Sequence, residues 1–147
     1  MTLHTDESIA AIYGVEQKSR ILRPLFLSGV SAGFPSPAED YVDRKLDLNE
    51  LLIKNPAATF FVRVAGDSMI GAGIHNDDIL IVDRALEAGN GKIVIAVYNG
   101  ELTVKRLLQD KKGIRLVAEN PDYPPLIIAE ESDCEIWGVV TSVIHQL

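Results

Sequence analysis

The dipeptide Asn99-Gly100 lies between two runs rich in β-branched residues, and it narrows the possible folds of this chain more than any other feature. Asn-Gly is the strongest short signal for a two-residue β-hairpin turn, because both turn positions take a positive φ. Such a turn sets the register of the two strands. The expected pairs are Tyr98–Glu101, Val97–Leu102, Ala96–Thr103 and Val94–Lys105. An antiparallel sheet is therefore the expected framework.

Further β-like runs follow from Ala58 onward, each bounded by Gly, Asn, Asp or Pro. A helical region is expected at residues 39–54, where acids come early, Lys54 comes late and Asn55-Pro56 follows. The predicted fold class is mostly β, with one short helical segment. The predicted strands are residues 58–65, 79–83, 92–98, 101–108, 114–118, 125–129 and 135–144.

The N-terminal residues carry weaker signals. The run IAAIYGV at residues 9–15 fits either one helical turn or a short strand. Residues 21–27 are apolar but contain Pro24, which suits an edge or arm segment. The next stretch, SGVSAGFPSPAEDY at residues 28–41, holds small residues and two prolines and is expected to be extended and accessible to cleavage. The sequence thus predicts an extended N-terminal arm.

Composition excludes several classes of protein. The chain has 147 residues, which suits one ordinary domain with a real core, and its net charge of −7 gives no basic surface for direct DNA binding. Its single cysteine, Cys134, cannot form an intramolecular disulfide, and a structural role in a reducing compartment is expected. No apolar stretch approaches the ~18–20 residues of a membrane span, and a secretory signal is not expected. The predicted location is the cytoplasm, with no membrane contact.

The run FVRVAGDSMI at residues 61–70 ends a β-like stretch on Gly66-Asp67-Ser68. Gly and Asp are common turn residues, so this segment fits a simple turn. Alternatively the turn presents Ser68 as a nucleophile, which would need a base. The histidines have no His-Asp-Ser grouping and no metal-ligand spacing, so surface or packing roles are expected for them and no metal site is predicted. They are His4, His75 and His145.

Lys105 is the remaining candidate for a base. The hairpin register places it on the face that carries Val94, Ala96, Tyr98 and Thr103. Two interpretations stay open: a solvent-facing lysine on a half-polar face, or a partly desolvated ammonium. Burial disfavours the charged form and can lower a lysine pKa by several units from ~10.4, which leaves a neutral amine that acts as a base. A Ser-Lys dyad would need no histidine.

The segment GDSMIGAGIHNDDILIVDRALEAGNGKIVIAVYNGELTVKRL, residues 66–107, resembles the catalytic core of the LexA/UmuD family of self-cleaving serine-lysine proteases. The segments GFPSPAEDYVDRKLDLNELLIKNPAATFFV (33–62) and WGVV (137–140) are also similar to that family. The resemblance covers about residues 25–147. It implies a LexA/signal-peptidase-like β-domain that needs no cofactor.

The resemblance also implies the roles of individual residues. Ser68 would be the nucleophile, Lys105 the general base, and the bond between Ala32 and Gly33 the point of self-cleavage. The backbone N–H groups of Asp67 and Ser68 would stabilise the oxyanion. Residues 1–32 would form a regulatory arm removed by cleavage, and residues 33–147 the protease-like β-domain. The arm is expected to dock on the β-domain through the apolar residues Ile21, Leu22, Leu25, Phe26 and Leu27.

The resemblance finally implies a role in the SOS DNA-damage response. Cleavage would be stimulated by a RecA filament on single-stranded DNA. The shortened form would be a homodimer that joins the catalytic subunit of a Y-family DNA polymerase for synthesis across lesions. Two alternatives are a catalytically silent interaction module and the C-terminal domain of a LexA-like repressor. The second is disfavoured because residues 1–32 show no helix-turn-helix pattern.

Overall fold

The computed structural model describes residues 4–15, 23–26, 42–128 and 134–147. Contacts divide the chain into two compact units. One unit combines Met1–Val15 with Asn55–Leu147, and the other is Glu16–Lys54. Ala32 and Gly33, where self-cleavage is predicted, lie outside the described residues, as do Ile21, Leu22 and Leu27.

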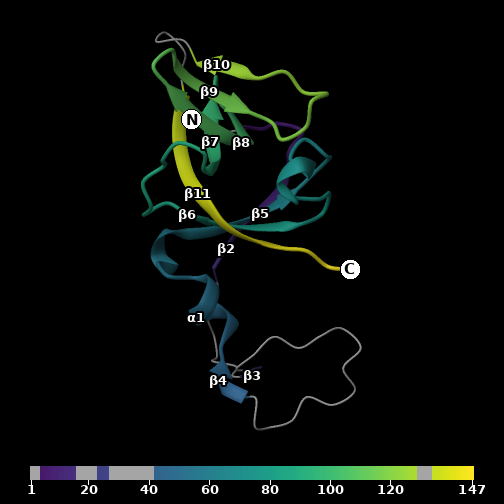
Figure 1. Ribbon diagram of the computed structural model, residues 1–147, viewed down its shortest axis with the longest axis vertical. Helices are drawn as coiled ribbons and strands as arrows, with labels where there is room; N and C mark the ends of the chain where they lie inside the picture. Colours follow the sequence, from purple (N-terminus) through teal and green to yellow (C-terminus); the bar gives the residue numbers. More distant parts are fainter. Residues whose placement is uncertain (1–3, 16–22, 27–41, 129–133) are drawn as a thin grey trace. The chain divides into compact units, whose positions relative to one another are not determined.

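One sheet forms the framework of the larger unit (Figure 1). Its strands follow the order β10-β9-β8-β7-β11-β6-β5-β2, and β1 pairs with β8. Only the β1–β8 pair is parallel among the described strands. The prediction of a mostly β fold is confirmed. The strands are β1 (His4–Thr5), β2 (Ile9–Gly14), β5 (Thr59–Val64), β6 (Ile79–Asp83), β7 (Ile93–Tyr98), β8 (Glu101–Asp110), β9 (Gly113–Val117), β10 (Leu126–Ile128) and β11 (Cys134–Ile144).

The β7–β8 hairpin has the predicted register. Tyr98 pairs with Glu101 and Val94 pairs with Lys105. The turn residues Asn99 and Gly100 have φ values of 50° and 82°, as a type I′ turn requires. Strands β5 to β11 match the seven predicted ranges to within two residues at each end.

Strand β11 joins the two halves of this sheet. In Figure 1 it is the long yellow strand, and it pairs with β7 along its first part and with β6 along its second. The register shifts where β11 passes from one partner to the other, between Ile136 and Gly138 and again before Ser142. A Cβ atom at Gly138 would lie 2.6 Å from Val82 Cγ1, so only glycine fits at this crossing.

The larger of the two clusters of buried side chains connects the sheet to the segment between β5 and β6. Met69 and Ile74 come from this segment and are buried with strand residues of β5, β6, β7 and β8. The short 3-10 helix η3 (Ile70–Ala72) lies between them. The residue that follows Ser68 is therefore anchored in the core. The strand residues are Val62, Val64, Leu80, Val82, Ile95, Val97, Leu102 and Val104, joined by Ile9 of β2.

Residues 9–14 form the strand β2, which decides between the two interpretations of IAAIYGV. β2 pairs antiparallel with β5, and its first pair joins Ile9 to Val64. Because residues 4–15 belong to the larger unit, the first part of the predicted arm supplies strands to the same sheet that carries Ser68 and Lys105.

The smaller unit contains β3 (Arg23–Phe26), β4 (Val42–Leu46) and the helix α1 (Leu48–Leu52). β3 and β4 form a separate two-stranded antiparallel sheet. The helix predicted over residues 39–54 is therefore wrong in its first part. Val42 and Leu46 both fall at even positions, which is also compatible with a strand. Asp47 follows that strand and caps α1 by accepting a hydrogen bond from Asn49 N (3.0 Å).

The 3-10 helix η2 (Pro56–Ala58) leads directly into β5. Like α1 and η3, it is short. Within the described part of the chain, no helix has the length and apolar character needed to cross a membrane.

Candidate active site

Ser68 lies in the turn that follows β5. Gly66 opens this turn with a φ of 79°, a left-handed conformation that glycine adopts without strain. The N–H of Gly66 donates a hydrogen bond to Asn76 Oδ1 (2.8 Å), and Met69 is buried on the other side of the serine. Both flanks of Ser68 are thus fixed by the fold.

The hydroxyl group of Ser68 is buried and has no partner in the part of the chain that the structure describes. The residue is 6% exposed, and its Oγ makes no hydrogen bond to any described residue. A buried polar group left unsatisfied costs about 1–3 kcal/mol, so such groups are rare unless they have a function. This oxygen is therefore available to react.

Ser68 and Lys105 line the same cavity, which has a volume of about 670 Å³. A cavity of this size lies within the range of about 300–1,000 Å³ that is usual for ligand sites. The walls come from four regions: the N-terminal segment, the turn after β5, strand β8, and the loop between β9 and β10. The lining residues are Thr5, Asp6, Glu7, Ser8, Ala65, Gly66, Ser68, Glu101, Lys105 and Tyr123.

The side chain of Lys105 is buried, with 8% of the residue exposed. Of the two interpretations of this lysine, the structure supports the desolvated one. Burial lowers the pKa of the Lys105 ammonium below its ordinary value, and the negative charge of Asp6 acts in the opposite direction. The result favours a larger neutral fraction near neutral pH than an exposed lysine would have.

The hydrogen bonds of Lys105 suit a base. Its Nζ donates to Thr103 Oγ1 (3.0 Å) and to the carbonyl oxygen of Val104 (3.3 Å). A neutral amine has two N–H groups and one lone pair. Because these two acceptors occupy both N–H groups, the lone pair stays free to accept a proton in the cavity.

A loop at residues 119–123 holds the turn that carries Ser68. Asn120 Nδ2 donates to the carbonyl oxygen of Asp67 (3.0 Å), and the Tyr123 hydroxyl donates to Asp67 Oδ1 (2.9 Å). Gly71 N donates to the carbonyl oxygen of Glu119 (2.7 Å). A Cβ atom at position 71 would also lie 2.7 Å from that oxygen, so a larger residue would collide there. The side chain of Asp67 therefore fastens this loop to the turn, in addition to forming the turn.

The predicted oxyanion donors lie at the same turn. Within the described residues, the structure gives no hydrogen-bond acceptor for the backbone N–H of Asp67 or of Ser68. The Asp67 carbonyl oxygen, by contrast, accepts bonds from Ile70 N (3.1 Å) and from Asn120. The peptide group that joins Asp67 to Ser68 is thus held in place through its carbonyl oxygen.

The N-terminal segment closes one side of the cavity. Asp6 N donates to Leu102 O (2.9 Å), which attaches the segment to β8. Val104 N donates to Ser8 Oγ (3.1 Å), and Ala65 N donates to Ser8 O (2.9 Å), so Ser8 bridges β8 and the end of β5. Ser8 also donates from its N–H (2.8 Å) and its hydroxyl to the Asp6 carboxylate. Sequence reasoning gave this segment no role in the site.

Comparison with known proteins identifies the family of this chain. Residues 24–141 match the family described as peptidase S24-like. The chain is 50% identical over 126 residues to Protein ImpA of Escherichia coli, with 85% of each chain covered. It is 52% identical over 123 residues to Protein SamA of Salmonella typhimurium, covering 84% of this chain and 85% of that one. It is 46% identical over 119 residues to Protein MucA of Escherichia coli, covering 80% and 81%. The chain therefore belongs to the peptidase S24-like family, the LexA/UmuD family that its motifs resemble.

Proposed function

We propose that this protein is a self-cleaving serine endopeptidase that cuts its own Ala32–Gly33 bond. One observation carries the proposal. The hydroxyl of Ser68, which no described residue hydrogen-bonds, shares a cavity with a buried lysine whose pKa is lowered by desolvation. A serine needs a base, and a neutral lysine meets that need without a histidine.

The mechanism begins with proton transfer. Neutral Lys105 takes the proton of Ser68 Oγ, and the oxygen attacks the carbonyl carbon of Ala32. The negative charge that develops on the carbonyl oxygen is stabilised by the N–H groups of Asp67 and Ser68. The tetrahedral intermediate collapses, and protonated Lys105 gives its proton to the departing amine of Gly33. Water then hydrolyses the acyl-enzyme at Ser68, with Lys105 again as the base.

The proposed role is in SOS mutagenesis, and family membership supports it together with the relatives ImpA, SamA and MucA. A RecA filament on single-stranded DNA would stimulate the cut in the cytoplasm. Residues 33–147 would then form a homodimer and join the catalytic subunit of a Y-family polymerase for translesion synthesis. A net charge of −7 favours protein partners over direct DNA contact.

The test is the mass of the products. Purified protein incubated at alkaline pH, where more Lys105 is neutral, is expected to yield a fragment that begins at Gly33. Intact-mass spectrometry over a time course identifies the cut to the residue. A chain that stays whole at every pH would support the alternative of a catalytically silent interaction module. A cut at another bond would refute the assignment of Ala32 and Gly33.

Asp6→Asn is expected to shift the pH dependence of self-cleavage to lower pH. Burial lowers the pKa of Lys105 and the charge of Asp6 raises it. Removal of that charge therefore lowers the pKa further, so the neutral base forms at a lower pH. The measurement is the initial cleavage rate as a function of pH.

Glu7→Gln is the matched control for Asp6→Asn. Glu7 is also an acid that lines the cavity, but its charge does not contribute to the shift at Lys105. The plot of cleavage rate against pH for Glu7→Gln should have the same midpoint as that of the unchanged protein. If both variants move the midpoint equally, the effect reflects net charge and not the specific electrostatic effect of Asp6 on Lys105.

Asn120→Ala is expected to slow self-cleavage by about fivefold, which corresponds to a net hydrogen bond of about 1 kcal/mol lost from the geometry of the Ser68 turn. The variant removes the bond from Asn120 Nδ2 to the carbonyl oxygen of Asp67. Asn90→Ala is the control, because Asn90 bonds to Gln109 N and does not line the cavity. Equal cleavage rates in the two variants would show that the bond does not position Ser68.

A further inference from the structure

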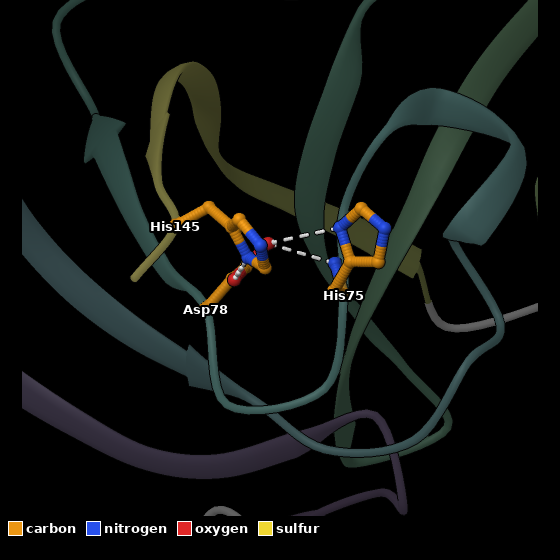
Figure 2. A group of neighbouring side chains, drawn as sticks. All are labelled: His75, Asp78 and His145. Atoms are coloured by element: carbon orange, nitrogen blue, oxygen red, sulfur yellow. Dashed lines mark hydrogen bonds and ion pairs between the residues drawn. The ribbon is translucent and has the colours of Figure 1, made fainter. Parts of the chain in front are cut away.

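His75, Asp78 and His145 meet at one end of the β6–β11 pair, although they are far apart in the sequence. The last pair of these antiparallel strands joins Ile79 to Ile144. Asp78 directly precedes Ile79, and His145 directly follows Ile144. Continuation of the register by one residue therefore sets Asp78 opposite His145, as Figure 2 shows.

A tight turn brings His75 to the same place. Asp78 N donates to His75 O (3.1 Å), and His75 N donates to Asp78 Oδ2 (2.7 Å). Asp77, inside the turn, has a φ of 75°, a left-handed conformation that aspartate tolerates better than most residues. Two independent features of the backbone, a strand register and a turn, thus converge on one carboxylate.

The three side chains leave their donor atoms close together. His145 Nδ1 lies 2.6 Å from Asp78 Oδ1, and His75 Nδ1 lies 3.7 Å from Asp78 Oδ2. One ligand atom from each residue can be chosen so that all lie within 4.8 Å of one another. The Asp78 side chain is 2% exposed, whereas those of His75 and His145 are 48% and 42% exposed. The group therefore combines one fixed, buried carboxylate with two imidazoles that are open to solvent.

Hydrogen bonding alone explains only part of this arrangement. The bond from His145 to Asp78 is short and well formed, but 3.7 Å between His75 Nδ1 and Asp78 Oδ2 is too long for a hydrogen bond. The two imidazole rings are nevertheless tilted by 38° with centroids 4.7 Å apart, and Figure 2 shows the carboxylate directed at both of them.

The Asp78 carboxylate is buried and held by the N–H of His75, whereas both imidazoles stay open to solvent. Two imidazole nitrogens and a carboxylate oxygen form the ligand set that zinc and other first-row divalent ions accept. Calcium and magnesium prefer oxygen ligands alone.

We propose that His75, Asp78 and His145 bind a divalent transition-metal ion, with Zn²⁺ as the representative ligand. Ligand atoms about 2.0–2.2 Å from such an ion lie about 3–4 Å apart. The exposed imidazoles reach this spacing by small rotations around the buried carboxylate. Three protein ligands leave at least one coordination position to water on the open side.

The proposed ion would act on the structure next to the Ser68 turn and not in the catalytic cavity, because none of its three ligands lines that cavity. Asn76 lies inside the same turn as His75 and Asp78 and accepts the hydrogen bond from Gly66 N. Val64, at the end of β5, exchanges backbone bonds with Asp77 and Asp78 (both 2.8 Å). A bound ion would cross-link the end of β11 to this turn and stabilise both.

The test uses the full chain with Ser68→Ala, so that the protein stays intact whether or not it cleaves itself. Zn²⁺ is titrated into this protein by calorimetry, and one ion per chain is expected. Loss of even an outer-shell partner typically weakens metal binding by about 10- to 100-fold. His75→Ala and His145→Ala are therefore each expected to weaken Zn²⁺ binding by at least about tenfold. Zn²⁺ should also raise the thermal midpoint of the parent protein, and raise it less in these variants.

His4→Ala and Cys134→Ser are the matched controls, because they remove the other histidine and the only thiol but leave the three proposed ligands in place. Both should bind Zn²⁺ like the parent. Co²⁺ added to the parent gives a second measurement that needs no variant: its visible absorption should change from that of the hydrated ion to that of a site with nitrogen ligands. Absence of binding, an unchanged Co²⁺ spectrum, or equal Zn²⁺ affinity in the parent and in His145→Ala would overturn the proposal.

Discussion

Ser68→Ala is expected to abolish the fragment that begins at Gly33. The substitution removes the oxygen that forms the acyl-enzyme, and loss of the nucleophile in a serine protease lowers kcat by about 10⁶-fold. Cleavage at that rate would not be detected by intact-mass spectrometry, even after prolonged incubation at alkaline pH.

The fold should tolerate Ser68→Ala well. Ser68 Oγ is buried and makes no hydrogen bond to any described residue, so its removal leaves no partner unsatisfied. The thermal midpoint should stay level or rise, since an unsatisfied buried polar group costs about 1–3 kcal/mol. A Gly33 fragment at the parent rate would show that another residue is the nucleophile. A collapse of thermal stability would show that Ser68 has an undetected structural partner.

Lys105→Arg is expected to be almost as inactive, although it keeps a positive charge. An arginine side chain stays protonated in proteins and has no lone pair to accept the Ser68 proton. Loss of a general base usually costs about 10²- to 10⁴-fold in rate. The measurement is the cleavage rate across alkaline pH, where the lysine enzyme should accelerate and the arginine variant should not.

Lys105→Met is the companion variant for this prediction. Methionine fills a similar volume without charge, so it separates loss of the base from strain caused by the larger guanidinium. Both variants should be inactive, and the methionine variant should be at least as stable as the parent because Lys105 is buried. Near-normal cleavage by either variant would refute the neutral-lysine mechanism.

Local signals explain why so much of the sheet was predictable. Asn99-Gly100 requires positive φ at adjacent residues, and the resulting turn fixes the whole register that places Lys105 beside Thr103 and opposite Val94. The strands of the larger unit from β5 onward are bounded by Gly, Pro, Asn or Asp, which mark their ends in the sequence itself. The register placed Lys105 among apolar residues but left two interpretations open, and its burial became clear only in the structure.

Contacts between distant residues explain what the sequence did not reveal. Asn120 and Tyr123 donate hydrogen bonds to Asp67 from 53 and 56 positions away in the sequence. No pattern in the sequence around Asn120 and Tyr123 predicts this role. The group of His75, Asp78 and His145 forms only when β6 pairs with β11, so the one available signal was the position of two of them at the adjoining ends of predicted strands. Apart from tight hairpins such as β7–β8, local patterns carry no information on which strands become neighbours.

The helix prediction for residues 39–54 was wrong in its first part for a different reason. Their apolar positions satisfy a helical and an alternating pattern at once, and pairing with β3 decided in favour of a strand over Val42–Leu46. Strand β1 was not predicted because it has only two residues, and β2 stayed open between a helical turn and a strand because its partner β5 lies much later in the chain. In both regions the tertiary partner overrode a weak local preference.

Strand β2 precedes the proposed cut, whereas its partner β5 follows it. In the intact chain the connecting peptide keeps β2 near β5 at an effective concentration on the order of millimolar. Cleavage at Ala32–Gly33 would end that tether. β2 would then bind β5 only at the concentration of the free fragment in the cell, and a strand of another protein could take its place. Departure of β2 would leave the backbone N–H and C=O groups of β5 as an open template for strand addition. It would also carry Asp6 away from Lys105, so the proteolytic product would have a different partner surface and a lower pKa at Lys105 than its precursor.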